Sequence, residues 1–167
     1  MRTIVLIFLV LFFIPYSYSQ DYYQYNQYGI PQKVGTYQQN SYNNSTDYYQ
    51  YNQYGIPQKV STYQQNNYNN NTDYYNYNQY GIQQKVGTYQ KNDYNNSTDY
   101  YQYNQYGIPE KKQTYEKNYN GGYDVYDYNQ YGIKQRSGTY EKNYNGGYDL
   151  YRYNQYGIKE KVGTMQR

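Results

Sequence analysis

The sequence predicts a tandem-repeat protein without a globular core: either a β-hairpin or β-solenoid-like array, or a largely disordered low-complexity chain. The pentapeptide Asn-Gln-Tyr-Gly-Ile occurs six times, at a spacing of 26 residues three times and then 25 residues twice. A fixed period of this length is typical of an array of one supersecondary unit. Tyrosines alternate with other residues inside each unit, as a strand requires. Aliphatic residues are scarce after residue 20, which favours disorder unless tyrosine rings replace them.

The first nineteen residues predict a signal peptide, 1–19. Arg2 gives a short positive start, 4–14 is an unbroken apolar run, and the small residues Ser17 and Ser19 fit a signal peptidase site. The eleven residues of this run rise only about 16 Å as a helix, whereas a bilayer core is about 30 Å thick. We therefore expect no stable membrane span, cleavage after Ser19, and a secreted, extracellular protein. The alternative is an uncleaved membrane anchor.

Each repeat is expected to form one β-hairpin. The first strand is clearest at 125–128 and 150–153, where tyrosines recur at every second position. A turn is expected over 26–32, because Gly29 has a permissive backbone and Pro31 lacks a ladder donor, and a second strand over 33–37. One face of the first strand is expected to be solvated, because the position between its paired tyrosines is always polar. These positions are Gln24, Gln50, Asn76, Gln102, Asp127 and Arg152.

The array divides into two blocks. Repeats one to three, residues 20–98, have a 26-residue period and Asn-rich connectors. Repeats four to six, residues 99–167, have a 25-residue period, Asn-Gly-Gly connectors that signal tight turns, and a truncated last unit. The Asn-rich connectors contain N-glycosylation sequons, which are either used by a glycosylating cell or by-products of composition. The sequon asparagines are Asn43, Asn44, Asn70, Asn95 and Asn96.

The composition argues against catalysis. The chain has no histidine and no cysteine, so the usual general base and thiol nucleophile are absent, and its carboxylates are spread along the repeats. We expect no enzyme, no cofactor and no metal site. The aspartate that recurs once per repeat, first as Asp21, is interpreted as a residue that starts a turn or strand rather than as a calcium ligand. A net charge of +3 is too small to make nucleic acid an expected partner.

Tyrosine is the candidate functional residue. Its rings can stack, pair across sheets or couple covalently, and a basic residue such as Lys33 recurs near them once per repeat. This pattern predicts an adhesive or self-associating surface, or a surface that stacks on a ligand. The alternative is that the lysines are solvated charges that keep a sheet edge soluble. The tyrosines assigned to this repeat surface are Tyr25, Tyr28, Tyr51, Tyr54, Tyr77, Tyr80, Tyr103, Tyr106, Tyr128, Tyr131, Tyr153 and Tyr156.

Three resemblances bear on function. The bias toward Tyr, Gln, Asn and Gly resembles prion-like low-complexity domains, which implies self-association and cross-β structure. The segment 22–29, Tyr-Tyr-Gln-Tyr-Asn-Gln-Tyr-Gly, followed by Val34-Gly35, loosely resembles the aromatic hairpin units of bacterial choline-type cell-wall binding repeats. That resemblance implies a β-solenoid that holds ligands between aromatic rings. In composition, the repeats also resemble Tyr-rich secreted matrix, eggshell and adhesive proteins.

Two functions follow as expectations. The first is a secreted structural or adhesive protein that associates with itself or with other matrix components in an extracellular matrix, coat or biofilm. The alternative is an aromatic β-hairpin module that binds glycan or cell-wall ligands. Multivalency is central to both, because the same unit is presented six times.

Overall fold

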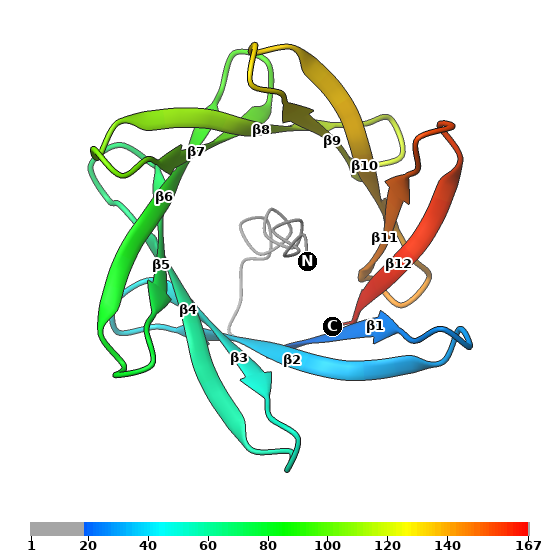
Figure 1. Cartoon of the computed structure of the whole chain (residues 1–167), viewed down its shortest axis with the longest axis horizontal. Helices are drawn as coiled ribbons and strands as arrows, with labels where there is room; N and C mark the ends of the chain where they lie inside the picture. Colours follow the sequence, from blue (N-terminus) through cyan, green and yellow to red (C-terminus); the bar gives the residue numbers. More distant parts are fainter. Residues whose placement is uncertain (1–18, 167) are drawn as a thin grey trace.

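The computed structural model describes residues 19–166, and in it twelve β-strands form one closed ring (Figure 1). The first six strands are β1 (Gln20–Tyr25), β2 (Pro31–Asn40), β3 (Ser45–Tyr51), β4 (Pro57–Gln65), β5 (Thr72–Tyr77) and β6 (Gln83–Asn92). The last six are β7 (Ser97–Tyr103), β8 (Pro109–Lys117), β9 (Tyr123–Tyr128), β10 (Lys134–Lys142), β11 (Tyr148–Tyr153) and β12 (Lys159–Gln166). Within the described residues, no helix is long and apolar enough to cross a membrane. The predicted signal peptide lies outside the described residues, except for Ser19.

Each repeat contributes one antiparallel hairpin, as the sequence predicts. In the first repeat, β1 and β2 flank a turn over 26–30, and every strand pairs with its neighbours along the chain. The last strand, β12, pairs with β1 and closes the barrel. The expectation of a chain without a globular core is therefore wrong, and so is the disordered alternative. Closure gives both end strands a partner and turns one face of the sheet into an enclosed core.

The core is built mainly from tyrosine. Side chains alternate across a sheet, so each hairpin of the first four repeats points one tyrosine inward from each strand, such as Tyr22 and Tyr37, which are 2 % and 1 % exposed. Inward rings of neighbouring hairpins stack, with 4.5 Å between the ring centroids of Tyr37 and Tyr48. The interior of a twelve-stranded barrel is wide, and large rings fill it where small aliphatic side chains would leave voids. The buried apolar residues are Tyr22, Tyr37, Tyr63, Tyr89, Tyr100, Tyr115, Tyr123, Val125, Tyr140, Tyr148, Leu150 and Met165.

The polar face predicted for the first strand is the inner face of the barrel. Gln24 lies two residues after the buried Tyr22 and therefore points to the same side of the sheet. The equivalent Gln50 and Gln102 are exposed, because they lie beyond the tyrosine layer. The paired tyrosines on either side of this position, Tyr23 and Tyr25, point outward and are half-buried.

A β-bulge in the second strand of every hairpin shapes the wall. In the first hairpin, Tyr22 pairs with Gly35 but Tyr23 pairs with Lys33, so Val34 is the extra residue. The same shift occurs in all six hairpins. A bulge bends and twists a strand, and a bulge at one level in every hairpin curves the sheet evenly toward closure.

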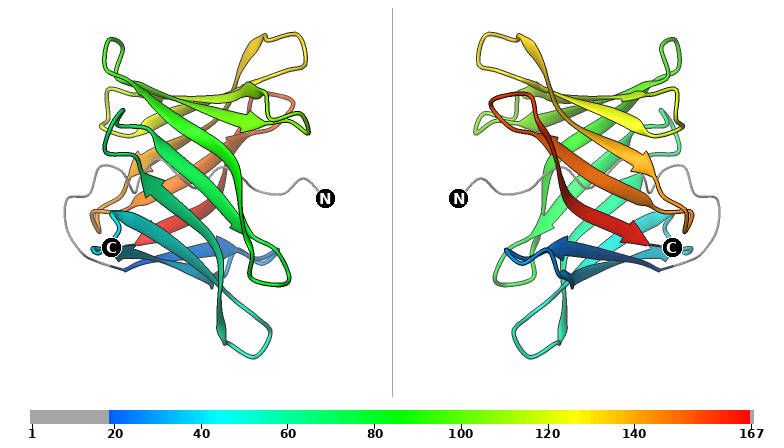
Figure 2. Two further views of the ribbon diagram at one scale, coloured as in Figure 1. Left: turned by 90° about the vertical axis from the view of Figure 1, so that its left-hand side faces the viewer. Right: turned by 90° about the vertical axis from the view of Figure 1, so that its right-hand side faces the viewer.

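The turns form two separate sets at opposite ends of the barrel, because successive strands alternate in direction. We name the six turns inside the repeats the repeat rim; they cover 26–30, 52–56, 78–82, 104–108, 129–133 and 154–158. We name the five segments between the repeats the connector rim; they cover 41–44, 66–71, 93–96, 118–122 and 143–147. Figure 2 shows turns that project beyond the strand ring at both ends.

Candidate functional site

Each turn of the repeat rim has a defined conformation that the side chain of its first residue stabilises. In the first turn, Oδ1 of Asn26 accepts hydrogen bonds from the backbone N–H groups of Tyr28 (2.9 Å) and Ile30 (3.0 Å). The N–H of Gly29 donates to the carbonyl oxygen of Asn26, and Gly29 has a φ of 72°, which favours glycine. The same bonds recur in the other five turns. The sequence therefore folds one turn six times.

These turns expose apolar side chains. Tyr28 is 76 % exposed and Ile30 is 56 % exposed, although both are large and apolar. The five other turns repeat this pair with nearly the same exposed fractions. All six exposed pairs lie at the same end of the barrel, because the repeat turns all fall on one side of the strand ring. The repeat rim therefore presents six equivalent Tyr-Gly-Ile tips.

The connector rim also presents tyrosine, with a different composition. Tyr42 is fully exposed, and so is one tyrosine in each of the other four connectors. No isoleucine accompanies these rings. The predicted sequon asparagines, Asn43, Asn44, Asn70, Asn95 and Asn96, all lie on this rim and are exposed. Among them, Asn44, Asn70 and Asn96 have a positive φ of 53°.

The outer wall carries a belt of polar clusters, one per hairpin. In the first, Asp21 forms an ion pair with Lys33 at 2.8 Å and accepts a hydrogen bond from Oγ1 of Thr36 at 2.9 Å. The hydrogen bond to this carboxylate raises the pKa of Lys33. All six hairpins have both contacts, with Arg136 as the cation in the fifth. The recurring aspartate therefore joins the two strands of its own hairpin.

Tyrosines of the belt link each hairpin to the next. The Lys33 ammonium lies 5.2 Å from the ring centroid of Tyr51, whose hydroxyl lies 3.1 Å from Oγ1 of Thr36. Cation–π contacts of this kind occur at all six boundaries, including that between Lys161 and Tyr25, where the last hairpin meets the first. The recurring cations thus contact side chains of their own barrel, on its outer wall.

The structure divides the predicted tyrosine set into two groups. The belt tyrosines are half-buried, and each lies under a cation of the same barrel: Tyr25, Tyr51, Tyr77, Tyr103, Tyr128 and Tyr153. The tip tyrosines are exposed on the repeat rim: Tyr28, Tyr54, Tyr80, Tyr106, Tyr131 and Tyr156. Sequence reasoning missed the isoleucine beside each tip tyrosine. Its constant place, directly after the turn glycine, was the available signal.

A groove lies at the second turn of the repeat rim, where Gln53 and Gly55 are among its lining residues. It has a volume of about 530 Å³, and Lys33, Gln50, Tyr51 and Asn52 are among its lining residues. Amides, a cation and an aromatic ring are the groups that sugar-binding sites use.

Among residues 19–166, no group of His, Cys, Asp or Glu side chains gathers as a metal site. No protein-family model matches this chain, and no curated protein matches it either.

Proposed function

We propose that this is a secreted structural or adhesive repeat protein that associates with itself, or with other matrix components, through the repeat rim. The observation that carries the proposal is the set of six equivalent tips, each with an exposed tyrosine and an exposed isoleucine. The proposal includes no catalytic role. It also includes export, with the first strand of the barrel starting at Gln20, directly after the predicted cleavage site.

Multivalency supports this role. A single Tyr–Ile tip offers little area, so one contact between two tips is weak. Six tips on one rigid barrel make each further contact intramolecular, which raises avidity by orders of magnitude without any new type of contact. Because the turn bonds and the belt fix the tips, little conformational entropy is lost on association.

The test is to remove the apolar tips while the turns are kept. Tyr28→Ser with Ile30→Thr, and the same changes at the other five tips, leave the Asn26 and Gly29 bonds of each turn unchanged. We expect wild-type protein to form larger species with increasing concentration in sedimentation velocity, and the six-tip variant to remain monomeric. Variants with two or four altered tips should show graded loss. The proposal is wrong if the six-tip variant assembles like the wild type.

The connector rim supplies the matched control. Tyr42→Ser and the equivalent change in the other four connectors remove exposed tyrosines from the opposite end of the barrel. We expect this variant to assemble nearly as well as the wild type. Loss of assembly in the connector variant alone would move the association surface to the other rim.

A second candidate function is binding of glycan or cell-wall ligands, and the groove beside Lys33 and Tyr51 favours it. Titration of oligosaccharides into monomeric protein, followed by amide chemical shifts, tests this candidate. Ligand-dependent shifts at Gln50 and Asn52 that Gln50→Ala abolishes support it. Shifts confined to the rim turns, or none at all, count against it.

A further inference from the structure

The last hairpin differs from the others on its inner face. Leu150 occupies a position that is tyrosine in repeats one to four, and Met165 replaces a tyrosine that is present in the other five repeats. Arg152 stands where the other repeats have Gln, Asn or Asp. On the outer face, the same hairpin keeps Asp149 and Lys161 of the belt. The departures are therefore concentrated inside the barrel.

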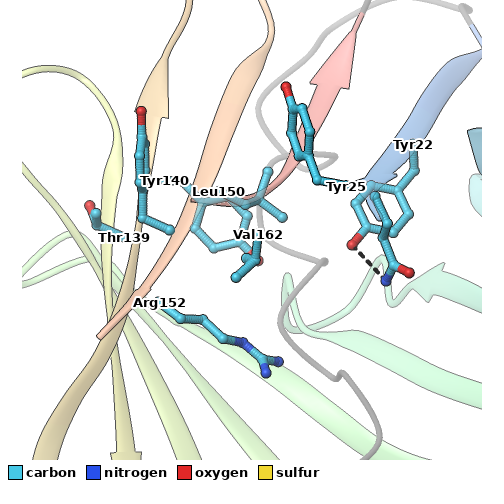
Figure 3. Close-up of a pocket in the computed structure, with 9 residues that line it drawn as sticks. Tyr22, Tyr25, Thr139, Tyr140, Leu150, Arg152 and Val162 are labelled. Carbon is cyan, nitrogen blue, oxygen red and sulfur yellow. Dashed lines mark hydrogen bonds between the residues drawn. The ribbon is translucent and has the colours of Figure 1, made fainter. Parts of the chain in front are cut away.

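Two of these residues, Leu150 and Arg152, border a cavity of about 200 Å³ (Figure 3). Leu150 and Val162 supply aliphatic surface, and the rings of Tyr22 and Tyr140 supply aromatic surface. Arg152 extends from β11 among them. The cavity thus combines an apolar lining with one guanidinium group, which is the pattern of a small-molecule site with one polar anchor.

The polar groups of this cavity have bonding capacity left. Nε of Arg152 and the hydroxyl of Tyr140 are buried, and neither has a hydrogen-bond partner among the described residues. Gln24 is already engaged, because its Nε2 donates to the hydroxyl of Tyr22 at 3.1 Å. A buried donor without a partner is costly, so a ligand that accepts from it gains binding energy.

No described carboxylate neutralises Arg152. Glu160 pairs opposite Arg152 in the β11–β12 ladder, but its carboxylate accepts a hydrogen bond from Nδ2 of Asn154 at 2.9 Å. Asp127, at the equivalent position of the preceding repeat, accepts from Nε2 of Gln113 at 2.9 Å. Within residues 19–166, Arg152 takes part in no ion pair, whereas Arg136 on the outer wall is paired with Asp124.

We propose that this cavity binds a small monocarboxylate with an apolar body, with Arg152 as the anchor for the carboxylate. A guanidinium binds a carboxylate through two parallel hydrogen bonds, and the interaction is stronger away from bulk water. Leu150, Val162 and the ring of Tyr22 then cover the apolar body. This ligand site is independent of the repeat rim.

The experiment uses protein purified after expression of the complete 167-residue sequence. Benzoate and hexanoate are titrated by isothermal calorimetry, and benzamide serves as the neutral analogue of benzoate. We expect one binding site per chain for at least one of the two carboxylates, and binding of benzamide weaker by about tenfold or more. Failure of both carboxylates to bind, or equal binding of benzamide, overturns the proposal.

Three variants test the location, and each introduces a residue that other repeats already have at the same position. Arg152→Gln removes the anchor and should weaken carboxylate binding by about tenfold or more. Leu150→Tyr fills the cavity and should abolish binding. Arg136→Lys removes a guanidinium from the outer wall and should leave binding unchanged. Thermal unfolding confirms that each variant is folded. Wild-type affinity in Arg152→Gln and Leu150→Tyr overturns the assignment.

Discussion

The ammonium group of Lys161 lies 5.3 Å from the ring centroid of Tyr25, although the two residues belong to the last and the first hairpin. The contact repeats, across the seam of the barrel, the one that Lys33 makes with Tyr51 between consecutive hairpins. The hydroxyl of Tyr25 also lies 3.4 Å from Oγ1 of Thr164. The belt is therefore continuous, and the seam is held by the same side-chain types as the boundaries between the first five hairpins.

Counted over residues 19–166, the seam is nevertheless the shortest ladder, and we predict that it opens first. The β1–β12 ladder has four residue pairs, whereas the β3–β4 ladder has seven. With fewer hydrogen bonds to break, its opening free energy should be lower by about 2 kcal/mol. Hydrogen–deuterium exchange measured by NMR checks this: amides that bond across the seam should exchange faster than amides of the same strands that bond to β2 or β11. Equal protection on both sides would contradict the prediction.

A buried belt carboxylate should matter more than an exposed one. Asp47 is 6 % exposed, pairs with Lys59 at 2.8 Å and accepts from Oγ1 of Thr62. Asp47→Ala removes an ion pair and a hydrogen bond from a buried site and should lower the free energy of unfolding by about 1–3 kcal/mol in urea titrations. The control is Asp93→Ala, which removes an ion pair with Lys91 of similar length on an exposed connector. This control should cause little change, because exposed ion pairs contribute little.

The glycines of the last connector should respond differently to alanine. Gly146 has a φ of 76° with open space around it, so Gly146→Ala should cost about 1 kcal/mol of backbone strain. A Cβ on Gly147 would lie 1.9 Å from the carbonyl oxygen of Met165, so Gly147→Ala must displace backbone and should cost about 3 kcal/mol. Gly146→Asn should be nearly neutral, because Asn44 adopts a positive φ at the matching turn position. Thermal unfolding of the three variants ranks them; equal losses would contradict both explanations.

The hairpins could be predicted from the sequence, because their signals are local. Alternating tyrosines, the Asn-Gln-Tyr-Gly-Ile turn and the following strand all lie within one repeat. Closure could not be predicted, because it depends on the pairing of Asp21 with Gln166 across almost the whole described chain. The core was missed for a related reason. Scarce aliphatic residues indicate disorder in most chains, but in a closed wide barrel the rings of Tyr22 and Tyr37 fill the interior.

The belt, and with it the division of the tyrosines between belt and rim, could not be predicted from a regular alternation of side chains along the strands. Lys33 and Thr36 are three residues apart and would point to opposite faces of a regular strand. The bulge at Val34 brings both to the outer face, where both bind Asp21. No composition signal marks this bulge, since Val60, Lys112 and Ser137 occupy the equivalent position in other repeats.

The tyrosine core predicts a loss of stability in alkaline solution. A tyrosine in an unfolded chain titrates near pH 10. Burial raises the pKa of Tyr48 to about 12, with a further contribution from Tyr22, and raises the pKa of Tyr37 and Tyr89 well above the usual value. Between pH 10 and about 12 the unfolded state has lost these protons while the folded state keeps them. The stabilisation is therefore complete below pH 10 and decreases as the pH rises through this window.

The variant Tyr48→Phe isolates one of these protons. It should reduce the slope of unfolding free energy against pH by about 1.4 kcal/mol per pH unit in that window, because one fewer proton is released on unfolding. Tyr42→Phe is the control, since Tyr42 is fully exposed on the connector rim, and its slope should equal that of the wild type. Urea titrations across alkaline pH, followed by NMR signals of carbon-bound methyl protons, measure the slopes. If Tyr48→Phe and Tyr42→Phe have the same slope, Tyr48 does not retain its proton in the folded barrel in this pH range. Burial then does not raise the pKa of Tyr48, which contradicts the prediction.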